Sequence, residues 1–298
     1  MNDLSDDEVT VLCCTRPVAK DTRVADLPKG IEDLRSNKSW YAVQTPHYLI
    51  MFDEVARKLQ DPVRFGNAAE RRLQAVAGLL DLKRDRSTKR YRLHSMIPYF
   101  LHDPAKLNYG NVEFQGIDVN ANATDSLFRH EEAHAILKEV AGGPPSLFNE
   151  GFAKFAEDPL SLIDDRCSLT GIRNKVVPLL VHIASSEGFW EHWRTYKPFV
   201  YRISESFVRH LFSTHGPRPF LKFARCTPYA ASAGVVLSSF RAAYGCSLRA
   251  AEDRWKAYLH NGGKRLTMSN KRRMGNITER EWADSRTQMV RNTLATAR

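Results

Sequence analysis

The order of hydrophobic and polar positions divides the chain into a first part that mixes strands with a helix and a second part made of helices. Apolar residues dominate 43–52 and 91–101, and each segment predicts a strand. Between these segments, over 53–82, apolar residues recur at helical spacing. Beyond residue 123 the pattern is helical, with breaks at glycine and proline. This order predicts an α+β fold.

A third predicted strand, 111–120, changes the face on which its apolar residues lie. They occupy even positions before Gly116 and odd positions after it. A shift of one residue at a glycine is what a β-bulge produces, and bulges are common at sheet edges beside active sites. We therefore expect 111–120 to be a bulged edge strand close to a functional site.

The next segment, 124–143, predicts one helix, because a capping residue precedes its helix formers and a glycine pair follows them. Inside it, His130, Glu131 and His134 form the pattern H-E-x-x-H. Side chains four residues apart share one face of a helix, so both imidazoles can bind one tetrahedral metal ion. Glu131 lies about 100° round the helix from His130 and can reach a metal-bound water, whereas Glu132 points away.

The neighbours of the two histidines favour a metal site over a solvated surface helix. Leu127, Leu137 and Ala141 line the same stripe of the predicted helix as His130 and His134. A surface helix would keep its histidines outside the apolar stripe. Their place in the stripe indicates that the histidines are buried for a purpose.

A catalytic zinc ion usually takes three protein ligands and keeps a fourth position for water, so a further ligand is needed. Glu150 lies in a second predicted helix that starts at Pro145 and Ser146 and ends at Pro159. Gly151 inside that helix costs about 1 kcal/mol relative to alanine, which close approach to the H-E-x-x-H helix would explain. We therefore predict one Zn²⁺ per chain, bound by the two motif histidines and Glu150.

These two motifs carry a family resemblance. H-E-x-x-H at 130–134 followed by N-E-G-F-A at 149–153 resembles the gluzincin metallopeptidases, and most of all their peptidase MA-like branch. Two later segments, 201–211 and 248–259, are similar to helices that follow the zinc site in that branch. The resemblance implies a two-lobed zincin fold, with a mixed β-sheet upper lobe that includes the H-E-x-x-H helix and a mainly helical lower lobe.

The resemblance also implies a reaction, zinc-dependent hydrolysis of peptide bonds. Glu131 would activate the zinc-bound water as a general base. Tyr201 occupies the place of the residue that stabilises the oxyanion in related enzymes, and Arg202, His210 and Tyr196 are alternatives. The bulged edge strand would pair with an extended peptide substrate. Whether cleavage is internal or terminal stays open.

Composition adds the organisation of the chain and one clue about partners. The 298 residues are 43% hydrophobic and 26% charged, as in an average globular protein. We expect four parts: an irregular N-terminal arm (1–38), an upper α+β lobe (39–143), a helical lobe (144–260) and a basic tail (261–298). The tail holds nine Lys and Arg residues against three acids, so +6 of the net charge of +10 lies there.

The basic tail keeps a second hypothesis open. Positive tails bind nucleic acid, acidic lipid or an acidic protein, so the chain would also suit a DNA-associated metalloprotease targeted through 261–298. That reading is similar in logic to the SprT-like crosslink-repair proteases, whose third ligand is a histidine, whereas Glu150 is the better candidate here. A third hypothesis is an inactive binding or scaffold protein with a structural metal site, in which Glu131 would have no duty.

Other features bear on location. No apolar stretch approaches the roughly 20 residues of a membrane span, and the acidic first residues lack the pattern of a signal peptide. The five cysteines are odd in number and form no C-x-x-C pair, so they indicate neither a disulfide framework nor a cysteine zinc site. We expect a cytoplasmic protein without a membrane span.

Overall fold

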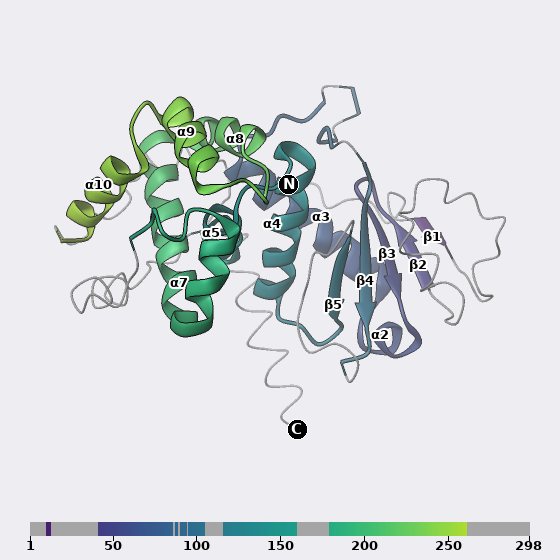
Figure 1. Cartoon of the computed structure of the whole chain (residues 1–298). Coiled ribbons are helices and arrows are strands. Elements are labelled where there is room, and N and C mark those ends of the chain that lie inside the picture. The colour runs from purple at the N-terminus through teal and green to yellow at the C-terminus, as the bar shows by residue number, and fades with distance from the viewer. Residues whose placement is uncertain are drawn as a thin grey trace.

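The computed structural model is a mixed α+β protein with one sheet and many helices (Figure 1). It describes residues 10–12, 41–85, 87–88, 90–93, 95–104, 116–159 and 179–260. The predicted basic tail, most of the predicted N-terminal arm and the first half of the predicted bulged strand lie outside these residues. The α+β prediction is confirmed.

Five strands form one mixed sheet in chain order. They are β1 (Thr10–Leu12), β2 (Tyr41–Gln44), β3 (Tyr48–Phe52), β4 (Ile97–His102) and β5 (Ile117–Asn120). The first three strands pair antiparallel, whereas β3, β4 and β5 run parallel. Among the described residues β5 pairs on one side only, so the prediction of an edge strand is confirmed for 117–120.

Two predicted strands have different bounds in the structure. The segment 43–52 is not one strand but parts of β2 and β3, which are joined by a tight turn at Thr45–His47. Pro46 in this turn has no N–H for a ladder, and Thr45 Oγ1 accepts a hydrogen bond from the backbone N–H of Tyr48 at 3.0 Å. The strand predicted from Tyr91 begins only at Ile97. Tyr91 instead forms an isolated antiparallel bridge with Arg84, and its N–H donates to His47 Nε2 at 3.0 Å.

The expectation of an irregular arm through residue 38 is wrong for Thr10–Leu12. These residues form β1 and pair antiparallel with β2, in the register Thr10 to Gln44 and Leu12 to Ala42. In this register Val11 lies opposite Val43. The alternating T-V-L pattern is too short to distinguish a strand from a loop by periodicity.

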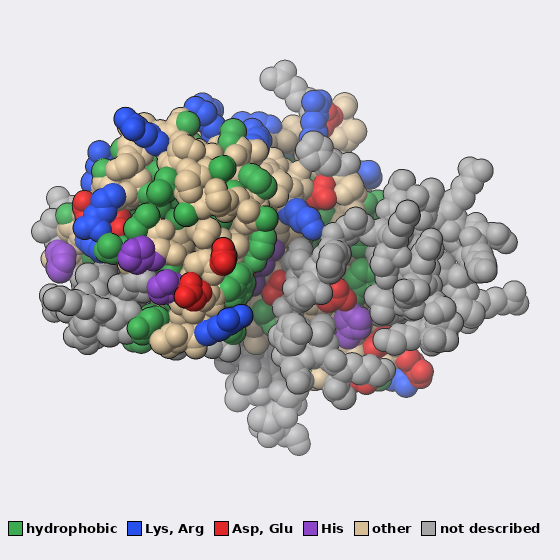
Figure 2. All heavy atoms as spheres, in the orientation of Figure 1, with side chains coloured by type: hydrophobic (Ala, Val, Ile, Leu, Met, Phe, Trp, Pro, Cys, Tyr) green, Lys and Arg blue, Asp and Glu red, His purple; other side chains and the backbone are tan. Residues whose placement is uncertain are grey.

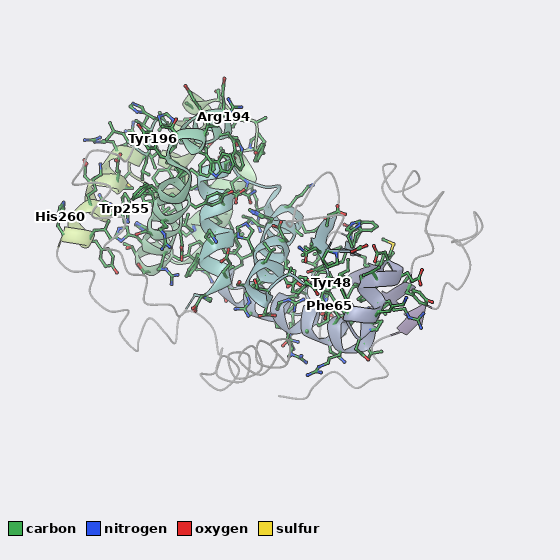
Figure 3. The ribbon with its side chains drawn as sticks, turned by 90° about the horizontal axis from the view of Figure 1, so that it is seen from below. Tyr48, Phe65, Arg194, Tyr196, Trp255 and His260 are labelled. Atoms are coloured by element: carbon green, nitrogen blue, oxygen red, sulfur yellow. The ribbon has the colours of Figure 1, made fainter. Side chains whose placement is uncertain are left out.

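Two helices connect β3 to β4 and cover one face of the sheet. They are α2 (Glu54–Leu59) and α3 (Pro62–Leu79), capped at their starts by the side chains of Asp53 and Asp61. Phe65 of α3 packs edge-to-face against Phe52, Tyr99 and Phe128, with ring centroids 5.2 to 5.7 Å apart. Figure 3 shows Phe65 beside Tyr48 in this core. We call this part, with its strands, the sheet region.

The H-E-x-x-H segment forms α4 (Asp125–Ala141), as predicted. Thr124 caps its start by accepting from the Leu127 N–H, and Gly142 ends it with a positive φ of 80°. In Figure 1, α4 lies between the sheet region and the remaining helices. Its Glu132, fully buried, pairs with Arg72 of α3 at 2.8 Å. This buried pair fixes the rotation of α4, so that the opposite face carries the histidines.

The remaining helices form a second group, which we call the helical region. It contains α5 (Ser146–Glu157), α7 (Ser186–His215), α8 (Pro217–Cys226), α9 (Ala233–Tyr244) and α10 (Leu248–His260). Trp255 of α10 is fully buried, and its Nε1 donates to Ser206 Oγ of α7 at 3.0 Å (Figure 3). The segments 201–211 and 248–259 therefore lie in helices, as expected.

A kink divides α7 at Tyr196, whose φ of −123° and ψ of 31° are not helical. Pro198 lacks the backbone N–H that would continue the helical ladder, and proline restricts the conformation of the residues before it. The kink folds the first part of α7 back, so that Phe189 packs edge-to-face on Tyr201 with ring centroids 5.9 Å apart.

Basic side chains gather on the outer surface of the helical region (Figure 2). Two exposed basic residues of α8 bind backbone carbonyls in the last turns of neighbouring helices. Lys222 Nζ donates to Ala242 O of α9 at 3.0 Å, and Arg225 Nε donates to Val140 O of α4 at 3.2 Å. Cations at helix C-termini oppose the negative end of the helix dipole, so these two charges have a structural role.

Among the described helices, none combines the length and the apolar content that a membrane span requires.

The reason expected for Gly151 is wrong in one respect. Gly151 does mark a close approach, but to α7 rather than to α4. A Cβ at Gly151 would lie 2.5 Å from Ser204 O and 2.7 Å from Val208 Cγ2. The backbone of α5 thus lies directly on α7, and any larger residue would separate the two helices.

We therefore predict that Gly151→Ala lowers the free energy of unfolding by about 1–3 kcal/mol or more, because the methyl group overlaps a backbone carbonyl. Gly234 of α9 is the matched control, since a Cβ there meets nothing within 4 Å. Gly234→Ala is expected to be neutral or to stabilise by up to about 1 kcal/mol. Urea unfolding of both variants measures the difference, and equal stabilities would contradict the prediction.

Candidate metal centre

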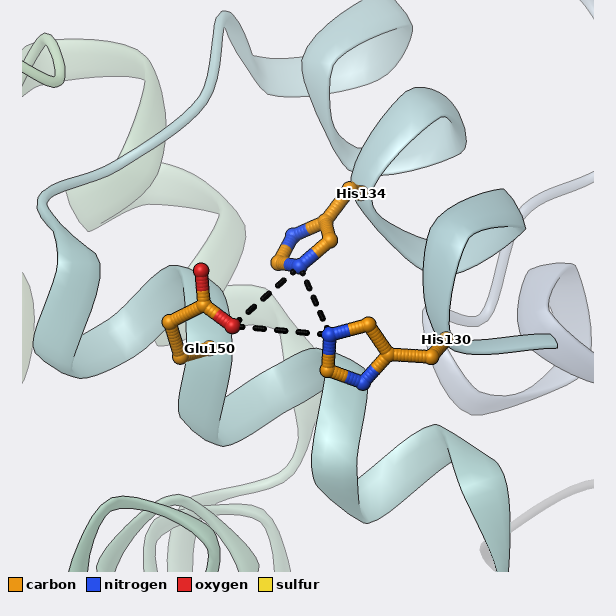
Figure 4. Close-up of side chains that lie close together, drawn as sticks. All are labelled: His130, His134 and Glu150. Atoms are coloured by element: carbon orange, nitrogen blue, oxygen red, sulfur yellow. Dashed lines mark hydrogen bonds and ion pairs between the residues drawn. The ribbon is translucent and has the colours of Figure 1, made fainter. Parts of the chain in front are cut away.

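His130 and His134 of α4 and Glu150 of α5 converge on one point (Figure 4). The two Nε2 atoms are 3.1 Å apart, and each lies 3.4 Å from Glu150 Oε2. Both histidines are buried, and the Glu150 side chain is 12% exposed. Within the described ranges this is the one group of three or more His, Cys, Asp or Glu residues with potential ligand atoms this close.

The spacing of the three atoms fits a metal ion better than direct contact. Ligand atoms about 2.0–2.1 Å from a tetrahedral zinc ion lie about 3.3 Å from one another. The observed separations of 3.1, 3.4 and 3.4 Å match that edge length. Two imidazole nitrogens and one carboxylate oxygen are also donors that zinc prefers. The residues present therefore fit a tetrahedral cation with a free fourth position.

The electrostatics of the three groups also favour a cation between them. Burial alone would lower the pKa of His130, but hydrogen bonds to Glu150 and Glu157 raise it to about 9. Burial would raise the pKa of Glu150, whereas His134 and His130 hold it well below its usual range. A positive charge, carried by a proton or a metal ion, is thus stabilised at the centre of this cluster.

A fourth residue, Glu157, orients the first histidine. Its Oε1 lies 2.8 Å from His130 Nδ1 and 2.7 Å from Lys154 Nζ. A histidine that donates its Nδ1–H to a carboxylate presents the lone pair of Nε2, and this arrangement is common in metal sites. His134 Nδ1 has no hydrogen-bond partner among the described residues. Of the two histidine rings, His130 is therefore the one that a carboxylate, Glu157, holds in a fixed orientation.

Sequence reasoning missed Glu157, although one signal was present. Glu157 follows Glu150 by two helical turns, so both carboxylates lie on the same face of α5. That spacing alone does not distinguish it from a solvated acid at a helix end.

Glu131 is buried beside the metal ligands and differs from the other acids nearby. Among the described residues its carboxylate makes no hydrogen bond or ion pair, whereas Glu132 pairs with Arg72. Burial raises the pKa of Glu131, and the two histidines oppose that rise. A buried carboxylate without a structural partner and with a raised pKa is suited to accept a proton as a general base.

Tyr201 lies close to this acid cluster. Its pKa is raised above the ordinary value by burial first, and then by the charges of Glu150 and Glu131. A raised pKa keeps the phenol protonated, so that it can donate a hydrogen bond. Phe189 packs on its ring and limits its motion.

The three alternatives to Tyr201 lie in other surroundings. Arg202 is exposed, and Tyr196 is at the kink of α7. His210 packs at a tilt against Tyr258 of α10, with ring centroids 5.1 Å apart. Glu150 and Glu131 contribute to the pKa shift of Tyr201, whereas the shift of His210 comes from burial, His215 and Arg254.

Comparison with protein-family models, with curated proteins and with solved structures finds no match for this chain.

We predict that Glu157→Ala weakens zinc binding by about 10–100-fold, because His130 loses the carboxylate that orients it. Competition with a chromogenic chelator measures the dissociation constant. Glu139→Ala is the matched control, since Glu139 belongs to the same helix as the histidines but binds Ser95. If both variants keep the affinity of the native protein, Glu157 has no part in the site.

His210 yields a prediction about pH. Burial lowers its pKa to about 4, with smaller contributions from His215 and Arg254. The folded protein therefore binds fewer protons at His210 than the unfolded chain, whose histidine titrates near 6.5. The group destabilises the fold as the pH falls from about 6.5 to 4, and has no effect above that window.

The variant His210→Phe, which keeps a ring against Tyr258, is thus expected to lose less stability between pH 7.5 and pH 4.5 than the native protein. Unfolding free energies at the two pH values measure the loss. His260→Phe, at the exposed end of α10, is the control and should follow the native protein. A parallel decline for native protein and His210→Phe would refute the assignment.

Proposed function

We propose that the protein is a zinc-dependent metallopeptidase of gluzincin type. In this proposal the chain adopts a two-lobed zincin fold, with 39–143 as the upper lobe and 144–260 as the lower lobe. One observation carries it: His130, His134 and Glu150 present three ligand atoms at tetrahedral spacing, next to a buried Glu131 without a structural partner. A purely structural metal site would need only the three ligands.

The identity of the metal follows from the donors and the expected chemistry. Zinc, when bound, would lower the pKa of a water molecule towards about 7 and polarise the substrate carbonyl. The same donor set also suits Fe(II), but an adjacent general base belongs to hydrolysis rather than to oxygen chemistry. Zinc is therefore the proposed ion, one per chain.

Each protein group then has a defined task. Glu131 accepts a proton from the attacking water and delivers it to the leaving amine nitrogen. Its raised pKa brings it closer to neutral pH, where both steps are possible. Tyr201, kept protonated, donates a hydrogen bond to the oxyanion of the substrate. Glu157 keeps His130 in the tautomer that a metal ligand requires.

The free edge of β5 supports a peptide as substrate. This strand precedes α4 by a short turn, and in the described residues it pairs only with β4. An extended peptide can add to such an edge through main-chain hydrogen bonds. The edge then aligns the substrate along the helix that bears the metal ligands (Figure 1).

The central test separates metal binding from turnover. His130→Ala and Glu150→Ala are expected to lose both zinc and activity, because each removes a ligand. Glu131→Gln is expected to keep one zinc per chain and lower kcat by about 10²–10⁴-fold, because it removes only the base. Elemental analysis gives the zinc content, and cleavage of a proteome-derived peptide library gives the activity.

Two results would contradict the proposal. A native protein that is fully folded and binds no zinc would exclude a metallopeptidase. A native protein that binds zinc but cleaves no peptide, with a side chain in the fourth position, would instead indicate the binding or scaffold role considered from the sequence.

A further inference from the structure

An exposed aromatic residue is held one helical turn from the candidate ligand Glu150. Tyr229, between α8 and α9, leaves 44% of its surface exposed. Its phenolic oxygen accepts hydrogen bonds from Ser146 Oγ at 3.2 Å and from Trp190 Nε1 at 2.8 Å. Ser146 and Glu150 are four residues apart on α5 and therefore share one face of that helix. Tyr229 thus lies beside the face of α5 that presents the ligand.

The backbone of Tyr229 is fixed as well. Ser186 Oγ donates to Tyr229 O at 2.7 Å and accepts from the Ser146 N–H at 3.0 Å. These bonds serve the start of α5, where Pro145 offers no side-chain cap. Helix capping explains why the serine hydroxyls and the Tyr229 carbonyl are hydrogen-bonded. It does not explain why the large Tyr229 ring lies at the surface. A ring held at both ends loses little further freedom when a ligand binds.

Further aromatic rings connect Tyr229 with Tyr201. The Trp190 ring lies 5.4 Å from that of Trp193 and 5.0 Å from that of Phe189. Phe189 in turn packs on Tyr201 at 5.9 Å. Trp190 and Trp193 are only partly buried, so they add apolar surface next to Tyr229.

The electrostatics agree with this arrangement. The pKa of Tyr201 is raised mainly by burial, and Glu150, Glu131 and Tyr229 all add to the rise. The Tyr201 phenol therefore lies near enough to Glu150, Glu131 and Tyr229 for their charges to act on it.

We propose that Tyr229, Trp190 and Trp193 form a surface that binds an apolar, preferably aromatic, side chain of the peptide substrate beside the bond that is cleaved. We call it the Tyr229 surface. The inference rests on the proposed peptidase function and adds the substrate class. The Tyr229 ring has a hydrogen-bonded phenolic oxygen and an exposed surface. Such rings stack well on apolar groups, and rigid tyrosines bind at a low cost in conformational entropy.

The experiment measures peptide binding without turnover. The zinc-loaded Glu131→Gln protein is titrated with two blocked octapeptides of alanine and serine, one with a central phenylalanine and one with alanine in its place. Isothermal calorimetry is expected to show about tenfold or tighter binding of the phenylalanine peptide, because one phenyl ring leaves water. Quenching or a shift of tryptophan fluorescence is expected with that peptide.

Variants in the same background locate the effect. Tyr229→Ala is expected to reduce the selectivity for phenylalanine to less than about threefold, whereas Tyr229→Phe keeps the ring and the selectivity. Leu59→Ala is the matched control, because Leu59 is an apolar residue of similar exposure on α2, in the sheet region. Zinc content and thermal unfolding confirm that each variant is intact, and Trp190→Ala replaces Tyr229→Ala if that variant does not fold.

Equal affinity for the two peptides, or selectivity that survives both Tyr229→Ala and Trp190→Ala, would overturn the inference. Failure of the proposed function looks different. In that case the native protein, with zinc bound, cleaves neither peptide. The Glu131→Gln protein still binds the phenylalanine peptide selectively, and this result supports the Tyr229 surface as a binding site.

Discussion

The contact between α5 and α7 at Gly151 is the constraint on which the rest of the site depends. Because Gly151 has no side chain, α5 lies directly on the backbone of α7 at Ser204. That contact sets how closely α5 packs on α7. The position of α5 in turn sets where Glu150 lies relative to the two histidines of α4. The separation of 3.4 Å between the candidate ligand atoms tolerates little change, so the packing of two helices controls the geometry of the candidate site.

The two faces of α4 divide the buried charges between them. On the side of α4 that faces the sheet region, Glu132 forms an ion pair with Arg72, and this pair stabilises the fold. Towards the helical region, His130 and Glu131 lie near Glu150 and Glu157, which both act to raise their pKa values. Charges buried without full compensation are costly and are found mainly at functional sites. The asymmetry of a single helix thus separates the stabilising pair from the reactive group.

Features of the candidate site that depend on residues close together in the chain could be predicted from the sequence. Both ends of α4 follow from Thr124 and Gly142, and the two histidines follow from their spacing along one helix. Glu150 follows from the number of ligands that a catalytic zinc needs. The sequence also predicts that Gly151 makes a close approach, but it names the wrong partner, because a missing Cβ carries no information about which helix fills the space.

Residues that depend on distant contacts could not be predicted in this way. Tyr229 gains its position from Ser146, Ser186 and Trp190, which belong to other helices. The strand bounds in the sheet could not be predicted either. The division of 43–52 into two strands depends on a turn within an otherwise continuous apolar run. Periodicity reports which side of an element is buried, and it does not report which element lies opposite.

The kink of α7 at Tyr196 has a consequence for what substitutions in this helix disturb. The part after the kink contains Ser204, against which α5 is seated, and a substitution there would disturb the metal ligands. The part before the kink contains Trp190, which touches none of the three ligands. A substitution at Trp190 can therefore change the surface of the protein there without moving the backbone contact that seats α5.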